Sequence, residues 1–258
     1  MDLARERARR WWLERAQIRT LGKAAAFIDD VGFAMLWPKK GHPMPSLWGA
    51  GSERGADIHV EWGPDAERMW GWKDELPKRR LAWYGPFLRG GKSFLSKSLL
   101  ADLYPRAGTT DDYRSVEQSK LARRIADILS ADGPQSAALL REATGARGPE
   151  FSKAAVELGR ALIITHSGVE EQGSGWPSAV YDLTARAFKP KPKGTAVERK
   201  RRAARRFLDT MIAASPSDLA RAFNWTSADA RATLDELVDS GEASSERVGH
   251  FPRYRLAR

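Results

Sequence analysis

The chain has 258 residues, of which 42% are hydrophobic, and this suffices for one large domain or two to three small ones. Basic residues number 43 against 33 acidic ones, so the formal net charge is +10 and polyanions are favoured as partners. Cysteine is absent and the four histidines are scattered, which excludes disulfides, thiolate catalysis and cysteine-ligated metal centres. No apolar run approaches the roughly 20 residues of a membrane span, and the N-terminal residues lack the apolar core of a signal peptide. We therefore expect a soluble, cytoplasmic protein that uses no metal and no cofactor.

The first third of the chain predicts three helices followed by strands. The expected helices are residues 3–17, 21–31 and 45–50. The expected strands are residues 32–38, 70–77, 81–89 and 92–96, with a turn at Gly90 and Gly91. Eight of the ten tryptophans precede residue 84, and the composition changes near residues 105–115. We therefore place an aromatic-rich N-terminal domain, winged-helix-like in its element order, at residues 1–112.

Residues 113–190 have the element order of a winged helix, which is a helix-turn-helix followed by a β-hairpin. Apolar side chains recur with helical spacing from Val116 to Leu129, and Ser136 is a suitable N-cap for a short helix. A third helix follows the turn at Gly145. Residues 161–165 and 178–183 then predict two antiparallel strands, which would form the wing.

Residues 191–258 repeat this order after a basic linker. A helix is expected from Glu198 to Ala214, a short second helix follows residues 215–218, and Thr226 caps a third. Residues 242–248 and 253–256 predict the wing strands. The fold class is therefore expected to be α+β and mainly helical, built from tandem winged helix-turn-helix modules, three if the N-terminal domain is included.

The positive charge is concentrated between Arg186 and Arg206, where ten basic residues stand against Glu198 alone. Proline and lysine alternate over residues 188–195, which predicts an extended linker, and a basic helix follows it. A solvated charge run beside a linker is one interpretation. We favour contact with phosphates, because so much positive charge lies next to small helical modules.

In a helix-turn-helix the third helix enters the major groove, and the wing adds contacts to phosphates or the minor groove. Both third helices are mixed in charge, a pattern that also suits protein–protein contact, whereas the last wing is more cationic. The residues that we expect to contact DNA are Lys153, Arg160, Arg199, Lys200, Arg201, Arg202, Arg205, Arg206, Arg231, Arg247, His250, Arg253 and Arg255.

Several short motifs of the N-terminal domain stand out. They are Gly32-Phe33, Leu36-Trp37-Pro38, the PSLW of residues 45–48, the WKDELP of residues 72–77, Tyr84-Gly85 and Leu88-Arg89. Followed by two winged helices, they resemble the AlkZ-related winged-helix DNA-binding proteins of bacteria, which lie near the AlkZ/YcaQ DNA glycosylases. Those glycosylases encircle duplex DNA with three tandem winged helices and remove alkylated bases without a metal. The resemblance implies a monomeric, nucleoid-associated protein linked to DNA repair.

The catalytic motif of those glycosylases is absent. They carry Gln-x-Gln in the first winged helix, where it orients the attacking water. This chain has four glutamines, and no two of them stand two positions apart. The expected place, residues 33–48, holds Met35, Trp37, His42 and Ser46 instead. The resemblance therefore transfers no catalytic residue.

Asp74 and Glu75 are the remaining catalytic candidates. Cleavage of a glycosidic bond requires an activated water, for which a carboxylate is the usual base. Trp70, Trp72 and Trp83 bracket this acidic pair, so its pKa values could be raised and a flipped base could stack nearby. The simpler interpretation, which we favour, is that the charges belong to a turn, and that most tryptophans belong to the core.

The hypothesis is a protein that binds double-stranded DNA and is linked to DNA repair, either as a metal-independent glycosylase with altered catalytic residues or as a non-catalytic binder. Two alternatives stay open. A transcriptional regulator would dimerise on a palindromic site and bind one sequence tightly. A protein-interaction scaffold would use the basic segment only for solubility.

Overall fold

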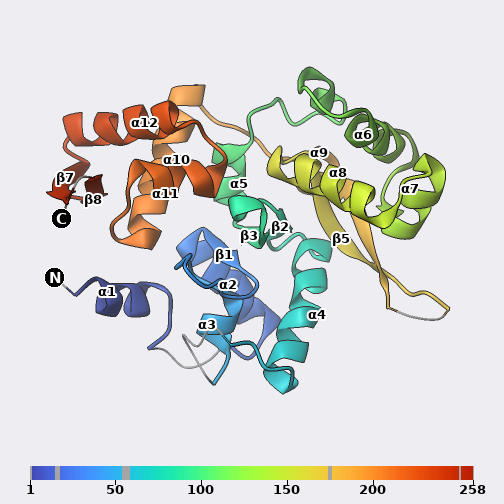
Figure 1. Cartoon of the computed structure of the whole chain (residues 1–258), viewed down its shortest axis with the longest axis horizontal. Helices are drawn as coiled ribbons and strands as arrows, with labels where there is room; N and C mark the ends of the chain where they lie inside the picture. The colour runs from blue at the N-terminus through green and yellow to red at the C-terminus, as the bar shows by residue number, and fades with distance from the viewer. Residues whose placement is uncertain (1, 15–17, 54–58, 174–175, 250, 258) are drawn as a thin grey trace.

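The computed structural model describes residues 2–14, 18–53, 59–173, 176–249 and 251–257. It is α+β and mainly helical, with small sheets, as expected from the sequence. The chain forms three segments: a first one coloured blue to green, a middle one coloured green to yellow, and a last one coloured orange to red (Figure 1).

The first segment contains α1 (Leu3–Arg10), α2 (Leu21–Val31), β1 (Phe33–Met35), α3 (Leu47–Gly51), α4 (Pro64–Lys78), β2 (Trp83–Pro86), the single turn η1 (Leu88–Gly90), β3 (Lys92–Leu95) and α5 (Lys97–Leu103). Helix starts coincide with polar N-caps: the Thr20 side chain accepts from the amide of Lys23, and the Ser46 side chain from that of Gly49. The three strands form an antiparallel sheet in the order β1-β3-β2.

The middle segment contains η2 (Asp112–Ser115), α6 (Lys120–Asp132), β4 (Gln135–Ser136), α7 (Ala137–Thr144), α8 (Gly148–Arg160), β5 (Ile164–Glu170), β6 (Ser178–Leu183) and α9 (Thr184–Phe188). The expected cap is confirmed, because the Ser136 side chain accepts from the amide of Leu139. The sheet order is β4-β6-β5, and the hairpin of β5 and β6 projects from the body of the molecule (Figure 1).

The last segment contains α10 (Ala196–Met211), α11 (Pro216–Phe223), α12 (Ser227–Asp239), β7 (Ala243–Val248) and β8 (Phe251–Leu256). Thr226 caps α12 by accepting from the amide of Asp229, as expected. An isolated antiparallel bridge joins Ala214, which follows α10, to Tyr254 of β8.

The three segments repeat one topology. Each runs helix, short extended stretch, helix, helix, strand, strand, and the short stretch pairs with the last strand of its segment. The sets are α2-β1-α3-α4-β2-β3, α6-β4-α7-α8-β5-β6 and α10-Ala214-α11-α12-β7-β8.

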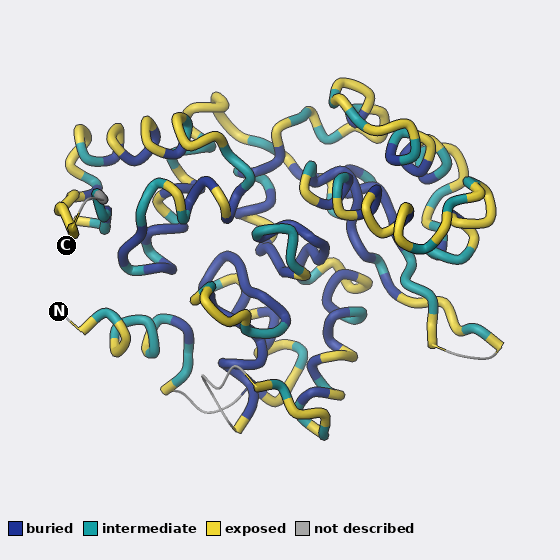
Figure 2. The backbone as a smooth tube through the Cα atoms, in the orientation of Figure 1, coloured by how far each residue is buried: buried dark blue, intermediate teal, exposed yellow. Residues whose placement is uncertain are grey.

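A shared core joins the first and last segments. Phe33 of β1 stacks on Phe207 of α10 with ring centroids 5.6 Å apart, and Phe223 of α11 meets both rings edge-on. Helix α10 is therefore buried along one side, with Ala203, Ala204, Phe207, Leu208, Thr210 and Met211 in the interior. Figure 2 shows buried backbone in dark blue through the middle of the molecule and exposed backbone mostly along its outer edges. Its Arg206 side chain passes over Gly32, where a Cβ would stand only 2.8 Å from it.

The middle segment packs on the first through equally close contacts. A Cβ on Gly159 of α8 would lie 2.6 Å from the ring of Pro86 in β2. The indole of Trp83 donates to the hydroxyl of Thr184, at 3.0 Å, across the same interface. The three segments therefore form one packed body, and surfaces from different segments can contribute to one site.

The expected strand at residues 70–77 was wrong, because these residues lie in helix α4. Pro64 at the first position and two acidic residues in the first turn favour the helix start. Met69, Trp72 and Leu76 then face the core with helical spacing. Aromatic residues favour strands, but in residues 70–77 the helical spacing of the buried side chains outweighs that preference.

The first wing strand of the middle segment also starts later than expected, at Ile164 instead of Ala161. Helix α8 runs to Arg160, and Leu162 takes a left-handed conformation with φ of 55° that turns the chain into the strand.

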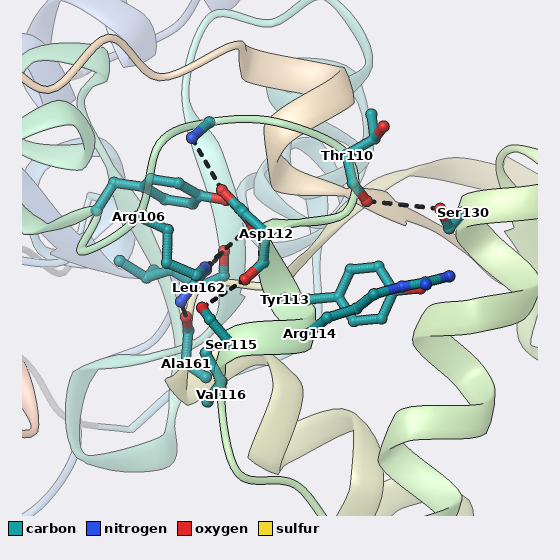
Figure 3. Close-up of polar contacts among 12 residues, drawn as sticks. Arg106, Thr110, Asp112, Tyr113, Arg114, Ser115, Val116, Ser130, Ala161 and Leu162 are labelled. Atoms are coloured by element: carbon teal, nitrogen blue, oxygen red, sulfur yellow. Dashed lines mark hydrogen bonds and ion pairs between the residues drawn. The ribbon is translucent and has the colours of Figure 1, made fainter.

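A buried ion pair fastens the connection between the first and middle segments (Figure 3). Arg106 Nε donates to Asp112 Oδ1 at 3.1 Å, and the two side chains are only 6% and 9% exposed. The same guanidinium donates to the carbonyl oxygens of Ala161 and Leu162, at 2.9 and 3.1 Å, beyond the end of α8. The carboxylate accepts a further bond from the hydroxyl of Tyr104. Additional hydrogen bonds of this kind are what allow a buried ion pair to offset its desolvation.

We predict that Arg106→Ala lowers the free energy of unfolding by about 3–5 kcal/mol, because it leaves the Asp112 carboxylate buried without its partner. Urea unfolding measures the loss. Arg79→Ala is the control, since it removes an exposed pair with Glu75 and should cost at most about 1 kcal/mol. Equal effects of the two substitutions would contradict the role assigned to Arg106.

Candidate nucleic-acid interface

A cationic groove lies where α11, α12 and the hairpin of β7 and β8 meet. It has a volume of about 640 Å³, and the first turns of both helices line it. Its cations are Arg221 from α11, Arg231 from α12 and Arg253 from β8. Helix N-termini carry partial positive charge, so they add to the attraction that the three guanidinium groups exert on anions.

The cations of the groove are mostly available for a ligand. Arg221 and Arg253 form no ion pair with any residue that the structure describes, and Arg231 has a long contact of 3.8 Å to Asp235. Asp218, the carboxylate in the groove, already accepts hydrogen bonds from the amide and hydroxyl of Ser215, at 3.1 and 2.8 Å. The groove therefore presents donors to an incoming anion.

Two further residues tie the groove to the other segments. Arg160, at the end of α8, donates to Asn224 Oδ1 at 2.9 Å, and Asn224 donates to the carbonyl oxygen of Phe87 at 3.3 Å. Asn224 follows α11 with φ of 57°, a conformation that asparagine tolerates well. One expected DNA contact, Arg160, thus lies at the point where all three segments meet.

The expected contacts on helix α10 have partners within the protein. Arg199 donates to the carbonyl of Gly194 at 2.9 Å, Lys200 pairs with Asp229 at 3.1 Å, Arg201 with Glu242 at 2.5 Å, Arg202 with Asp102 at 2.7 Å, Arg205 with Glu242 at 3.5 Å and Arg206 with Asp209 at 3.8 Å. The partners belong to α5, α12 and the turn before β7 as well as to α10 and its linker. Much of the dense charge run therefore contributes to internal ion pairs.

The other expected contacts are more exposed. Lys153 of α8 and Arg247 of β7 lie on the surface and pair with no described residue. Arg255 pairs with Glu246 across the hairpin. His250 lies outside the described residues. Arg221 of the groove was missed, because its helix is short and nothing in the local sequence marks it as facing the wing.

Asp74 belongs to a buried network between α4 and β5. Its Oδ1 accepts from His166 Nε2 at 2.5 Å and from Lys73 Nζ at 2.6 Å. His166 is only 4% exposed and Lys73 only 8%. The ammonium of Lys73 also lies 4.2 Å from the ring centre of Trp70, a cation–π contact. Sequence spacing could not reveal this network, because Asp74 and His166 are far apart in the chain.

The pKa of Asp74 is lowered, contrary to the raised value considered from the sequence. Burial alone would raise it, but the hydrogen bonds from His166 and Lys73 outweigh burial. Burial also lowers the pKa of His166, and this outweighs the attraction of Asp74. The pair is therefore a charged carboxylate that accepts from a neutral imidazole.

Glu75, the second catalytic candidate, points elsewhere. Its side chain is 37% exposed and pairs with Arg79 at 2.8 Å and with Lys78 at 3.8 Å. Both acidic residues lie in helix α4, so the expected turn was wrong. Among the nearby tryptophans, Trp72 and Trp83 are buried, whereas Trp62 and Trp70 are 56% and 38% exposed.

We predict that stability falls as the solution is acidified below pH 6.5, the ordinary pKa of histidine. Burial lowers the pKa of His166 in the folded protein. Its contribution to stability is therefore complete above the ordinary histidine pKa and is lost as the pH falls from there toward the lowered pKa of the folded state. The depressed pKa of Asp74 adds a loss of the same sign below its ordinary 3.8. Urea unfolding of His166→Phe should give a flatter dependence between about pH 5 and pH 7.5 than the parent chain. An unaltered slope would contradict this, and His59→Phe, at an exposed position, is the control.

Comparison with known proteins identifies the fold and then the family. The solved structure of the DNA glycosylase AlkZ from Streptomyces sahachiroi superimposes with a TM-score of 0.61 at 14% identity, covering 97% of this chain and 67% of that one. The fold of the chain is therefore AlkZ-like. The model of the AlkZ-related family matches residues 18–224, so the chain belongs to this family, and the resemblance seen in the sequence is confirmed.

Two further comparisons add little. The DIP2311 protein from Corynebacterium diphtheriae, at 17% identity, has a TM-score of only 0.24 and covers 82% of this chain and 38% of that one, so it carries no argument. No curated protein matches the chain.

Within the described part of the chain, no helix is long and apolar enough to cross a membrane, and no group of three or more histidine, aspartate or glutamate residues is arranged to hold a metal ion.

Proposed function

We propose that the chain is a DNA-repair protein that binds double-stranded DNA as a monomer through three tandem winged helices, in the bacterial cytoplasm and on the nucleoid. The repeated topology supports the winged helices, because each segment has a helix-turn-helix followed by a hairpin that pairs with the short stretch after the first helix. The modules correspond to residues 1–112, 113–190 and 191–258. Membership of the AlkZ-related family and the fold of a DNA glycosylase favour DNA as the partner.

The observation that carries the proposal is the groove of the last segment. Helix α12 stands in the position of a recognition helix, and the hairpin of β7 and β8 stands in the position of the wing. Arg221, Arg231 and Arg253 line the space between them and have few internal partners. Phosphodiesters are the natural ligands of such an array, because guanidinium groups form strong charge-assisted hydrogen bonds with them.

Cations outside the groove extend the proposed DNA-contact surface. In this proposal Lys153, Arg160 and Arg247 extend the contact surface from exposed positions, and the hairpin cations Arg253 and Arg255 add to it. The paired cations of α10 contribute to the electrostatic field, while the ion pair of Arg202 with Asp102 joins the last module to the first.

We predict that replacing Arg221, Arg231 and Arg253 together by alanine weakens duplex binding for all sequences alike. Each phosphate contact contributes about 0.9 to the slope of log K against log salt, so the slope should fall by about that amount per arginine that touches a phosphate. Fluorescence anisotropy over a salt series measures both quantities. Lys23, Lys120 and Arg141, replaced together, form the control, because they are exposed, remove the same charge and lie outside the groove.

The alternatives give different outcomes in the same titration. Binding of one palindromic sequence by a dimer would favour a transcriptional regulator. Duplex binding without salt dependence, or none, would favour a protein-interaction scaffold and contradict the proposal.

Release of bases from alkylated duplex DNA tests the two acidic residues of α4. We expect neither residue to be catalytic, because Asp74 is held by His166 and Lys73, and Glu75 by Arg79. Asp74→Asn should lower the melting temperature and Glu75→Gln should change it little, with base release per folded molecule equal to that of the parent chain. Loss of release at an unchanged melting temperature would assign catalysis to the substituted residue.

A further inference from the structure

Two residues of the first segment border the groove of the last segment. Arg89 of η1 donates from Nη2 to Asp218 Oδ1 at 3.4 Å, and from Nη1 to His42 Nδ1 at 3.1 Å. Asp218 lines the groove, and Arg221 beside it acts electrostatically on both Arg89 and His42. A cluster of His42, Arg89 and Arg221 therefore adjoins the groove across the boundary between the first and last segments.

Arg89 has a strained backbone conformation and a buried side-chain donor. Its backbone has φ of 52° and ψ of 29°, a left-handed conformation that costs an arginine conformational energy and that glycine would adopt freely. Its side chain is only 17% exposed, and its buried Nε has no hydrogen-bond partner among the described residues. A buried N–H without an acceptor is costly, and an anion bound beside Arg89 would supply that acceptor.

The contact with Arg89 determines which atom of His42 carries the proton. A guanidinium can only donate, so Nδ1 of His42 accepts, and the proton of the neutral ring lies on Nε2. Burial lowers the pKa of His42, and the nearby cations Arg89, Lys39 and Arg221 lower it further, so the ring is neutral near pH 7. Nε2–H has no acceptor among the described residues and is a donor rather than a base.

We propose that His42, Arg89 and Arg221 bind a phosphodiester of the DNA strand that leaves the groove of the last segment. The inference rests on the proposed function and adds to it a phosphate site supplied jointly by the first and last segments. His42 Nε2, Arg89 Nε and the guanidinium of Arg221 are all donors, and the neighbouring carboxylate, Asp218, is already engaged by Ser215 and Arg89. A tetrahedral anion with several acceptor oxygens fits this set of donors.

The site has a consequence for how DNA lies on the protein. A strand that contacts both Arg253 in the last hairpin and His42 in the first segment must run along the boundary between these segments. The shared core of Phe33, Phe207 and Phe223 holds the two surfaces in a fixed relation, so the donors are placed before DNA arrives.

The experiment compares Arg89→Gly with Arg80→Gly in fluorescence-anisotropy titrations of a labelled duplex over a salt series. Arg80 is a matched control, because it is exposed, has a similar φ of 56° and loses the same charge, yet lies at the end of α4. Glycine relieves the backbone strain at both positions. Arg89→Gly should weaken binding about tenfold and reduce the salt slope by about 0.9, whereas Arg80→Gly should leave both unchanged.

Two substitutions of His42 test the phosphate site independently of Arg89. His42→Phe removes the neutral donor, so it should weaken binding several-fold without changing the salt slope near pH 7.5. His42→Gln offers a carbonyl to Arg89 and an amide N–H to the ligand, so it should restore part of the affinity. These variants keep the test decisive if Arg89→Gly fails to fold.

The outcomes separate this site from the proposed function. Absence of duplex binding by the parent chain would overturn the proposed function and this site with it. A second outcome would overturn this site alone. In it, replacing Arg221, Arg231 and Arg253 by alanine abolishes duplex binding, whereas Arg89→Gly and His42→Phe keep the affinity and the salt slope of the parent chain. Calorimetric titration with inorganic phosphate at fixed ionic strength tests whether the cluster binds a free anion instead. If Arg89→Gly loses phosphate binding but keeps the duplex affinity of the parent chain, the cluster binds free phosphate and the proposed DNA contact is wrong.

Discussion

The position of helix α10 is the constraint on which the rest of the structure depends. Its apolar side packs Phe207 between Phe33 of the first segment and Phe223 of the last, while its polar side reaches Asp102 of α5 and Glu242 before β7. A helix that must satisfy both neighbours fixes how they face each other. The groove of the last segment and the His42–Arg89 cluster of the first adjoin only because this packing is maintained.

The same helix changes the meaning of the net charge. From the sequence, the run ending at Arg206 looks like a continuous polyanion-binding segment. In the folded protein many of these cations pair with carboxylates, so their long-range attraction is partly cancelled, and paired surface charges contribute little to stability in any case. Attraction for phosphate then depends on fewer cations with weaker internal pairing, such as Arg221 and Arg253, which do not lie in a dense run.

Local signals predicted local structure well. Ser136 and Thr226 cap helices where expected, because an N-cap involves only the next three residues. The AlkZ-related family could also be inferred from short motifs. The sequence did not predict helix α4 at residues 70–77, where clustered tryptophans obscured a helical pattern. The contacts Asp74–His166 and Arg89–Asp218 could not be found either, since their partners are 92 and 129 positions apart and no spacing rule connects them.

The three segments share one topology but differ in surface charge, and this difference suits them to different roles. The hairpin of β5 and β6 carries the exposed acidic residues Glu170 and Glu171 and an exposed Trp176, whereas the hairpin of β7 and β8 carries Arg247 and Arg253. An acidic wing repels phosphate, so the middle hairpin is unsuited to the contact that the last one can make. The boundary between the first and last segments has the opposite character, since donors converge there from both sides. Under the proposed function, electrostatics favours a strand that runs along α11, η1 and the last hairpin, with the middle hairpin away from the phosphates.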